Sequence, residues 1–167
     1  MRSTYKVLLI AIASFSLVSC GIYSFTGASI PVEVQTISVT QFPNHAELVN
    51  PNLSPDFTEK LRDRFMSQTT LNVVTGAADW EVKGQIIDYY EKPRAANASG
   101  ASLNQLTIVV NVEFYDNQNE QNNWEKRFAR SQVFDGNSSL SDVEDELVED
   151  IGEQLVNDIF NKIAVNW

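Results

Sequence analysis

Residues 106–115, LTIVVNVEFY, decide the fold of this 167-residue chain. Along this stretch, side chains alternate between an apolar and a mixed set, which is the period of a β-strand. The apolar set is Leu106, Ile108, Val110, Val112 and Phe114. A strand with one apolar and one mixed face is typical of an antiparallel sheet that is covered on one side. The rest of the domain must therefore supply neighbouring strands and a layer that covers the apolar face.

Several other segments have strand character. Residues 79–90 alternate, and residues 124–134 return as a strand after a turn at residues 116–123. The apolar face of the segment 79–90 is Trp80, Val82, Gly84 and Ile86. Residues 30–40 are rich in β-branched side chains. The apolar side chains occupy even positions up to Val34 and odd positions from Ile37, and this change of parity predicts a bulge or twist between them. Residues 71–74 are long enough only for a short strand.

Two helices complete the pattern. The first is predicted to begin at Ser54 or Asp56 and to run to about residue 68. The second begins with a capping box of Ser141 and Glu144. Its apolar stripe repeats every four residues at Leu147, Ile151, Leu155, Ile159 and Ile163. This order predicts an α+β fold, a two-layer sandwich in which two amphipathic helices pack on one face of a mixed, largely antiparallel sheet of about four strands.

The amino terminus has the layout of a secretory signal peptide, with Arg2 and Lys6 ahead of an uncharged, mostly apolar run at residues 7–18. The run ends in Leu17, Val18, Ser19 and Cys20, which match the Leu-x-small-Cys consensus of bacterial lipoprotein signals. This match predicts signal-peptidase recognition at Leu17, Val18 and Ser19, cleavage before Cys20, and lipidation of Cys20. A membrane-spanning helix needs about 20 apolar residues, and an ordinary signal would leave the single cysteine without a disulfide partner.

The predicted organisation is a signal peptide at residues 1–19, a lipidated flexible tether at residues 20–29 and a single periplasmic α+β domain at residues 30–167. The tether segment is uncharged, contains two glycines and is rich in small residues. Because no acidic run follows Cys20, we expect a lipid anchor in the outer membrane, with the domain facing the periplasm.

Charge argues against one class of partner. The net charge is −10, and loss of Arg2 and Lys6 with the signal lowers it by two, to −12. Proteins that bind nucleic acid do so by neutralising phosphates, so we expect no nucleic-acid partner. Six cations lie in two groups: Lys60, Arg62, Arg64, Lys126, Arg127 and Arg130. They either form an anion-binding face or balance an acidic protein, and the second interpretation is favoured.

The sequence offers no assembled catalytic set. His45 is the only histidine, and Cys20, the only cysteine, is expected to carry lipid, so neither a catalytic triad nor a thiolate metal site is predicted. The acidic residues 144–146 with Glu149 and Asp150 are interpreted as a solvated helix face instead of a calcium site. We therefore expect no enzymatic activity, no catalytic residues, no metal site and no cofactor besides the covalent lipid.

The segment CGIYSFTG at residues 20–27 resembles the mature amino terminus of lipopolysaccharide-assembly lipoproteins (LptE) of Bacteroidetes-type bacteria. The helix entry LSPDFT at residues 53–58 and Ala78-Asp79-Trp80 followed by Gly84 agree with that family. The resemblance implies a lipoprotein that assists assembly of, and plugs, the outer-membrane β-barrel that inserts lipopolysaccharide into the outer leaflet. It implies that barrel as the partner, with lipopolysaccharide itself as a second candidate ligand.

One alternative stays open, an auxiliary periplasmic binding lipoprotein of another envelope or transport complex. Co-purification of an outer-membrane barrel would discriminate between the two. Two loops are candidate contact points, residues 93–102 and residues 116–123, because loops on a rigid scaffold commonly carry recognition.

Overall fold

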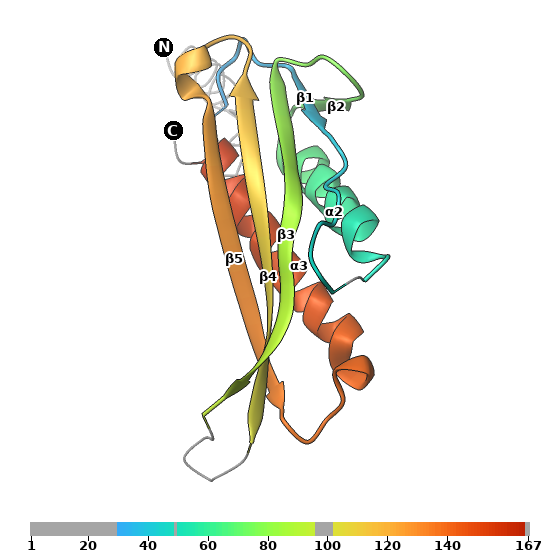
Figure 1. The fold of residues 1–167 in the computed structure, drawn as a ribbon. Coiled ribbons are helices and arrows are strands. Elements are labelled where there is room, and N and C mark those ends of the chain that lie inside the picture. Colours follow the sequence, from blue (N-terminus) through green and yellow to red (C-terminus); the bar gives the residue numbers. More distant parts are fainter. Residues whose placement is uncertain (1–29, 49, 96–101, 166–167) are drawn as a thin grey trace, which may run out of the picture.

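Two helices cover one face of a five-stranded sheet in the computed structural model, which describes residues 30–48, 50–95 and 102–165 (Figure 1). The strands are β1 (Thr36–Val39), β2 (Asn72–Val74), β3 (Trp80–Arg94), β4 (Leu103–Asp116) and β5 (Trp124–Asp135). The helices are α2 (Leu53–Gln68), α3 (Leu140–Ala164) and the short 3-10 helix η1 (Glu120–Asn122). The predicted two-layer α+β sandwich is confirmed.

The sheet is mixed, in the order β2-β1-β3-β4-β5. Strand β1 runs parallel to both of its neighbours, whereas β3, β4 and β5 form an antiparallel meander. The predicted number of about four strands is one short, because residues 72–74 add β2 at the edge beside β1. Strands β3 and β4 pair over most of their length, with one irregularity between Ile86 and Asp88.

Residues 106–115 lie in β4, between β3 and the edge strand β5, and their apolar face is buried under the helices. Its five alternating apolar residues, Leu106, Ile108, Val110, Val112 and Phe114, are all at most 2% exposed. All five α3 residues of the four-residue repeat belong to the same core cluster. The ring of Phe114 lies 5.3 Å from that of Trp80 in an edge-to-face arrangement. The predicted packing of the closing helix on this face is confirmed.

A glycine in β3 lets an aromatic ring lie directly on the sheet. A Cβ atom built on Gly84 would come within 2.4 Å of both Cε1 of Phe42 and the carbonyl oxygen of Asn111. Phe42 also packs edge-to-face on Phe57 of α2, with ring centroids 5.3 Å apart, and its N–H donates to the Thr58 hydroxyl at 3.0 Å. Gly84 thus makes room for the ring that joins the loop 40–52 to α2.

We expect Gly84→Ala to destabilise the domain by about 1–3 kcal/mol or more, because the backbone oxygen of Asn111 cannot move without disturbing the β3–β4 pairing. Gly152→Ala in α3 is the matched control, since the nearest atom to its Cβ would be Cδ of Lys60 at 4.0 Å. Alanine is the better helix former, so this change should stabilise the domain by up to about 1 kcal/mol. Urea unfolding measures both, and equal midpoints would contradict the account.

Two predicted boundaries are wrong. The expected strand at residues 30–40 is confined to β1, because residues 31–34 form a turn in which the N–H of Val34 donates to the carbonyl of Pro31 at 3.0 Å. The parity change between Val34 and Ile37 therefore marks a turn ahead of the strand and not a bulge within it. Helix α2 begins one residue early, at Leu53.

The predicted capping box at the start of α3 is also wrong. The helix begins at Leu140 after Ser139, and no side chain caps its amino terminus. The Glu144 carboxylate instead accepts hydrogen bonds from the Tyr89 hydroxyl on β3 and from the Asn50 amide, the latter at 3.1 Å. Asn50 in turn accepts from the N–H groups of Asn52 and Leu53 at 3.0 and 3.2 Å. Glu144 therefore joins three elements of the fold instead of closing its own helix.

Candidate contact surfaces

The side chains considered for catalysis lie apart in the structure. His45 is exposed in the loop before α2, where its backbone N–H donates to the carbonyl of Ile86 at 2.8 Å. Within the described ranges, no group of three or more His, Cys, Asp or Glu side chains is placed to hold a metal ion. The described residues therefore offer surfaces for a partner and no assembled metal site.

The three cations of α2 all form ion pairs or hydrogen bonds with other residues of the domain. Lys60 pairs with Glu149 of α3 at 2.5 Å, and Arg64 pairs with Glu153 of α3 at 2.8 Å. Arg62 donates to the carbonyl of Val39 at 2.7 and 3.1 Å and also contacts Glu59. The anion-binding interpretation does not hold for this group, because these cations join α2 to α3 and β1.

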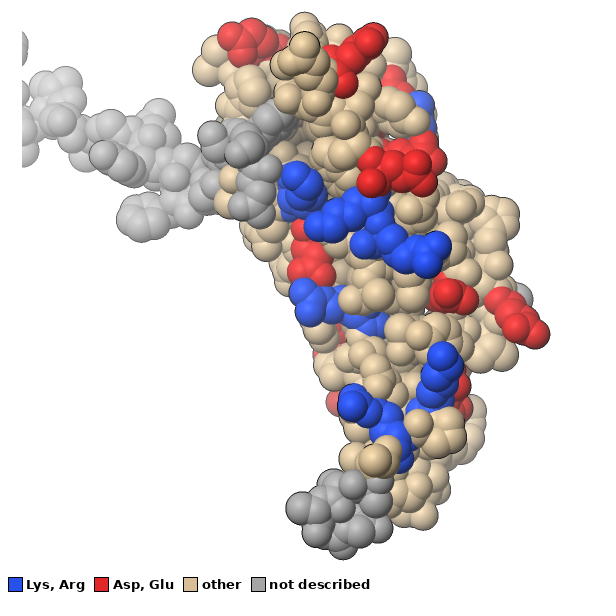
Figure 2. All heavy atoms as spheres, turned by 60° about the vertical axis from the view of Figure 1, so that its left-hand side comes forward, with Lys and Arg blue, Asp and Glu red and all other residues tan. Residues whose placement is uncertain are grey.

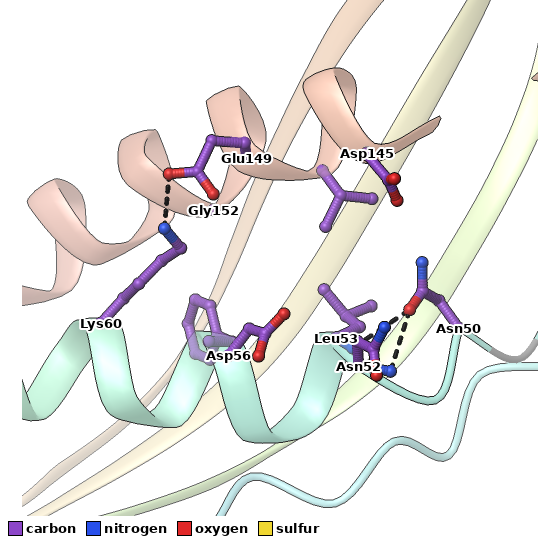
Figure 3. A pocket seen from close by; sticks show the side chains of 10 residues that line it. Asn50, Asn52, Leu53, Asp56, Lys60, Asp145, Glu149 and Gly152 are labelled. Atoms are coloured by element: carbon purple, nitrogen blue, oxygen red, sulfur yellow. Dashed lines mark hydrogen bonds and ion pairs between the residues drawn. The ribbon is translucent and has the colours of Figure 1, made fainter. Parts of the chain in front are cut away.

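A cleft of about 280 Å³ lies between the amino-terminal half of α2 and the facing turns of α3. Figure 3 shows Lys60 reaching across it to Glu149, with Asp56 and Asp145 contributed by opposite helices. Burial and the adjacent Glu144 carboxylate raise the pKa of Tyr89. This hydroxyl therefore stays protonated and donates a hydrogen bond to Glu144. Lys60 bonds to Glu149 at one end of the cleft and Asn50 bonds to the N–H of Asn52 at the other, so the cleft is best explained as a helix–helix seam.

The turn between β4 and β5, predicted as a contact point, is held in one conformation by hydrogen bonds from its own side chains. Asp116 is 2% exposed, and its carboxylate accepts from the N–H groups of Gln118 and Asn119 at 2.9 and 3.1 Å and from the Asn122 amide at 2.8 Å. Asn123 accepts from the N–H of Asp116 at 2.7 Å. The turn at residues 116–123 therefore has a fixed conformation and presents polar side chains, and we call it the polar tip. Of the other predicted contact loop, residues 96–101 lie outside the described residues.

A second carboxylate ties this tip to β1. Asp79 accepts from the N–H groups of Gln35 and Thr36 at 3.0 and 2.9 Å and from the Thr36 hydroxyl at 2.8 Å. The Gln118 amide of the tip donates to its other oxygen at 2.9 Å. These donors, led by the N–H of Gln35, lower the pKa of Asp79 from 3.8 to about 2.

The low pKa of Asp79 predicts a pH dependence of stability. A carboxylate whose pKa is lower in the folded state stabilises the fold above its unfolded pKa, and this contribution is lost as pH falls through the folded value. The wild-type urea midpoint should therefore fall more steeply between about pH 4 and pH 2 than that of Asp79→Asn. Asp63→Asn, at an exposed position of α2, is the control and should follow the wild type. Parallel curves for Asp79→Asn and the wild type would contradict this role.

Charge is not spread evenly over the surface. Figure 2 brings the β5 side of the molecule forward and shows Lys and Arg side chains gathered there, although the whole chain carries −10. Strand β5 lies at the edge of the sheet and contributes Lys126, Arg127 and Arg130. Lys162 near the end of α3 lines the same shallow hollow as Lys126 and Arg130. We call these four residues the β5 basic edge.

A family model described as lipopolysaccharide-assembly, LptE, matches residues 34–163, which include every strand and nearly all of both long helices. The chain belongs to the LptE family. The match confirms the predicted membership of the LptE family, and the LptE model ends within the last turn of α3.

Solved structures show the same fold at low sequence identity. A minor lipoprotein from Acinetobacter baumannii is 12% identical over 81% of this chain and 95% of that chain, with a TM-score of 0.55. A hypothetical protein from Chlamydia trachomatis is 13% identical over 80% of this chain and 99% of that chain, with a TM-score of 0.53. No curated protein sequence matches the chain. Identities this low support the fold alone.

The residues predicted for lipid attachment precede the LptE match. Cys20 and the recognition residues Leu17, Val18 and Ser19 lie outside the described residues, as do the signal peptide and the segment 20–29. Among the described residues, no helix combines the length and the apolar character needed to cross a membrane.

Proposed function

We propose that this LptE-family protein is an outer-membrane lipoprotein, anchored through lipid on Cys20 and facing the periplasm, that assists assembly of the β-barrel that inserts lipopolysaccharide and plugs its lumen. The observation that carries the proposal is the LptE match over residues 34–163. The predicted lipoprotein signal ending at Leu17, Val18, Ser19 and Cys20 supports the anchor, and residues 20–29 would form the tether.

The domain has the properties that a plug needs. A barrel lumen is polar, and the outer face of β4 and β5 carries polar and charged side chains, among them Asn111, which donates to Glu125 at 2.6 Å. A single core joins both long helices to one face of the sheet. Binding of this kind requires no turnover of substrate, no metal and no cofactor, and this role requires contact with the barrel but none with lipopolysaccharide itself.

Purification of the tagged lipoprotein in mild detergent, followed by mass spectrometry, tests the proposal. We expect one large outer-membrane β-barrel protein to co-purify in a stoichiometric amount. Recovery of a different envelope or transport complex in its place would contradict the plug and favour an auxiliary lipoprotein of that complex.

A further inference from the structure

Strand β5 presents a long free edge. It is the last strand of the sheet and spans twelve residues, whereas β2 at the other edge spans three. In an edge strand, every second residue directs its N–H and C=O away from the sheet. Between Glu125 and Phe134, no backbone group forms a hydrogen bond other than those to β4, within the described part of the chain. This edge is open to pairing with another polypeptide.

The cations on this edge differ from those of α2 because most of them are not neutralised by a carboxylate of the described residues. Lys126 and Arg127 are exposed, and no carboxylate of the described residues pairs with either. Lys126 lies 5.1 Å from the centre of the Phe128 ring, and Lys162 lies 5.7 Å from that of Trp124. Only Arg130 is neutralised, by two hydrogen bonds to Asp158 at 2.6 and 2.7 Å.

Most side chains of β5 are left exposed by the helix layer. Only Phe128 and Phe134 of this strand are buried, at 7% and 8% exposure. Lys126 and Arg130 alternate with Phe128 on the helix side of the strand, yet both are exposed. An added strand could therefore approach the edge without displacing α3.

We propose that the β5 edge binds an extended acidic segment of the partner barrel protein, which adds to the sheet as a further strand and places carboxylates opposite Lys126 and Arg127. The inference rests on the proposed function and names its contact face. Free backbone groups favour a polypeptide, because main-chain pairing supplies affinity in strand addition. A lipid phosphate would satisfy the cations but would leave the backbone edge without partners.

Charge reversal with a matched control tests the contact. Lys126→Glu combined with Arg127→Glu should reduce the barrel recovered in the co-purification by about tenfold or more, because like charges replace attractive ones. Lys92→Glu is the control and is compared with Lys126→Glu alone, because Lys92 lies on β3 outside the candidate contact loop 93–102 and, like Lys126, has no carboxylate partner among the described residues. This control should leave recovery unchanged. Urea unfolding establishes that these variants fold.

A photo-crosslinking amino acid identifies what lies against the edge. Placed at Val133 of β5, which is 43% exposed, it should form adducts with the barrel, whereas placed at Met66 of α2, 55% exposed, it should form none. In the purified complex, every second backbone amide of β5 should gain protection from hydrogen exchange, the pattern that strand addition produces.

Each other outcome overturns the inference. If the barrel co-purifies equally with the charge-reversed protein and Val133 forms no adduct, the contact lies elsewhere while the proposed function stands. If Val133 forms adducts with lipopolysaccharide or phospholipid only, the edge binds an anionic lipid. If no barrel co-purifies even with the wild type, the proposed function fails, and this inference fails with it.

Discussion

Cys20→Ala is expected to abolish lipid labelling of the protein and to leave it uncleaved or released from the membrane into the periplasm. The thiol of Cys20 is the predicted acceptor of the first acyl chain, and the new amino terminus after cleavage is the predicted acceptor of another. Each buried methylene contributes about 0.8 kcal/mol to membrane attachment, and one chain alone is marginal. Losing the cysteine should therefore remove the anchor altogether.

Metabolic labelling with palmitate and membrane fractionation measure this effect. Ser19→Ala is the matched control, because alanine is also small and preserves the Leu-x-small-Cys pattern. The control should be labelled and retained in the membrane as the wild type is. Labelling of the Cys20→Ala protein at the wild-type level would show that the anchor lies elsewhere.

Leu155→Ala is expected to destabilise the domain by about 2–5 kcal/mol, the usual cost of truncating a large buried side chain. Leu155 is completely buried in the stripe of α3 that covers the sheet. Met66→Ala on the exposed side of α2 is the control and should change stability by no more than about 0.5 kcal/mol. Urea unfolding measures both, and an unchanged midpoint for Leu155→Ala would show that this stripe is not part of the core.

The elements with strong local periodicity could be predicted from the sequence. Ile151, Leu155 and Ile159 recur every four residues, and all three are fully buried on one side of α3. In β4 the predicted apolar face is confirmed as buried, whereas Thr107 and Val109 of the opposite face are buried as well. In these elements the pattern depends on neighbours within the same segment, which sequence reasoning detects directly.

Contacts between distant segments could not be predicted in this way. Ser141 and Glu144 have the spacing of a capping box, but Glu144 bonds to Tyr89 and Asn50, which are 55 and 94 residues away in the chain. These alternative partners become available only when β3 and the loop before α2 meet α3.

The basic groups show the same limit. Sequence reasoning found the cations of α2 and of β5 but treated them alike, because their difference depends on which carboxylates the fold brings near. Lys60 and Arg64 of α2 face Glu149 and Glu153 of α3, whereas Lys126 and Arg127 lie on a strand that proves to be the sheet edge. Strand order, which no local pattern encodes, separates the two groups.

Depletion of the protein from cells tests the central claim most directly, with folded barrel in the outer membrane and lipopolysaccharide at the cell surface measured together. If the protein assists assembly of the barrel and plugs it, both quantities should fall, and a plasmid copy of the wild-type gene should restore them. Unchanged levels of folded barrel and of surface lipopolysaccharide after complete depletion would contradict the account.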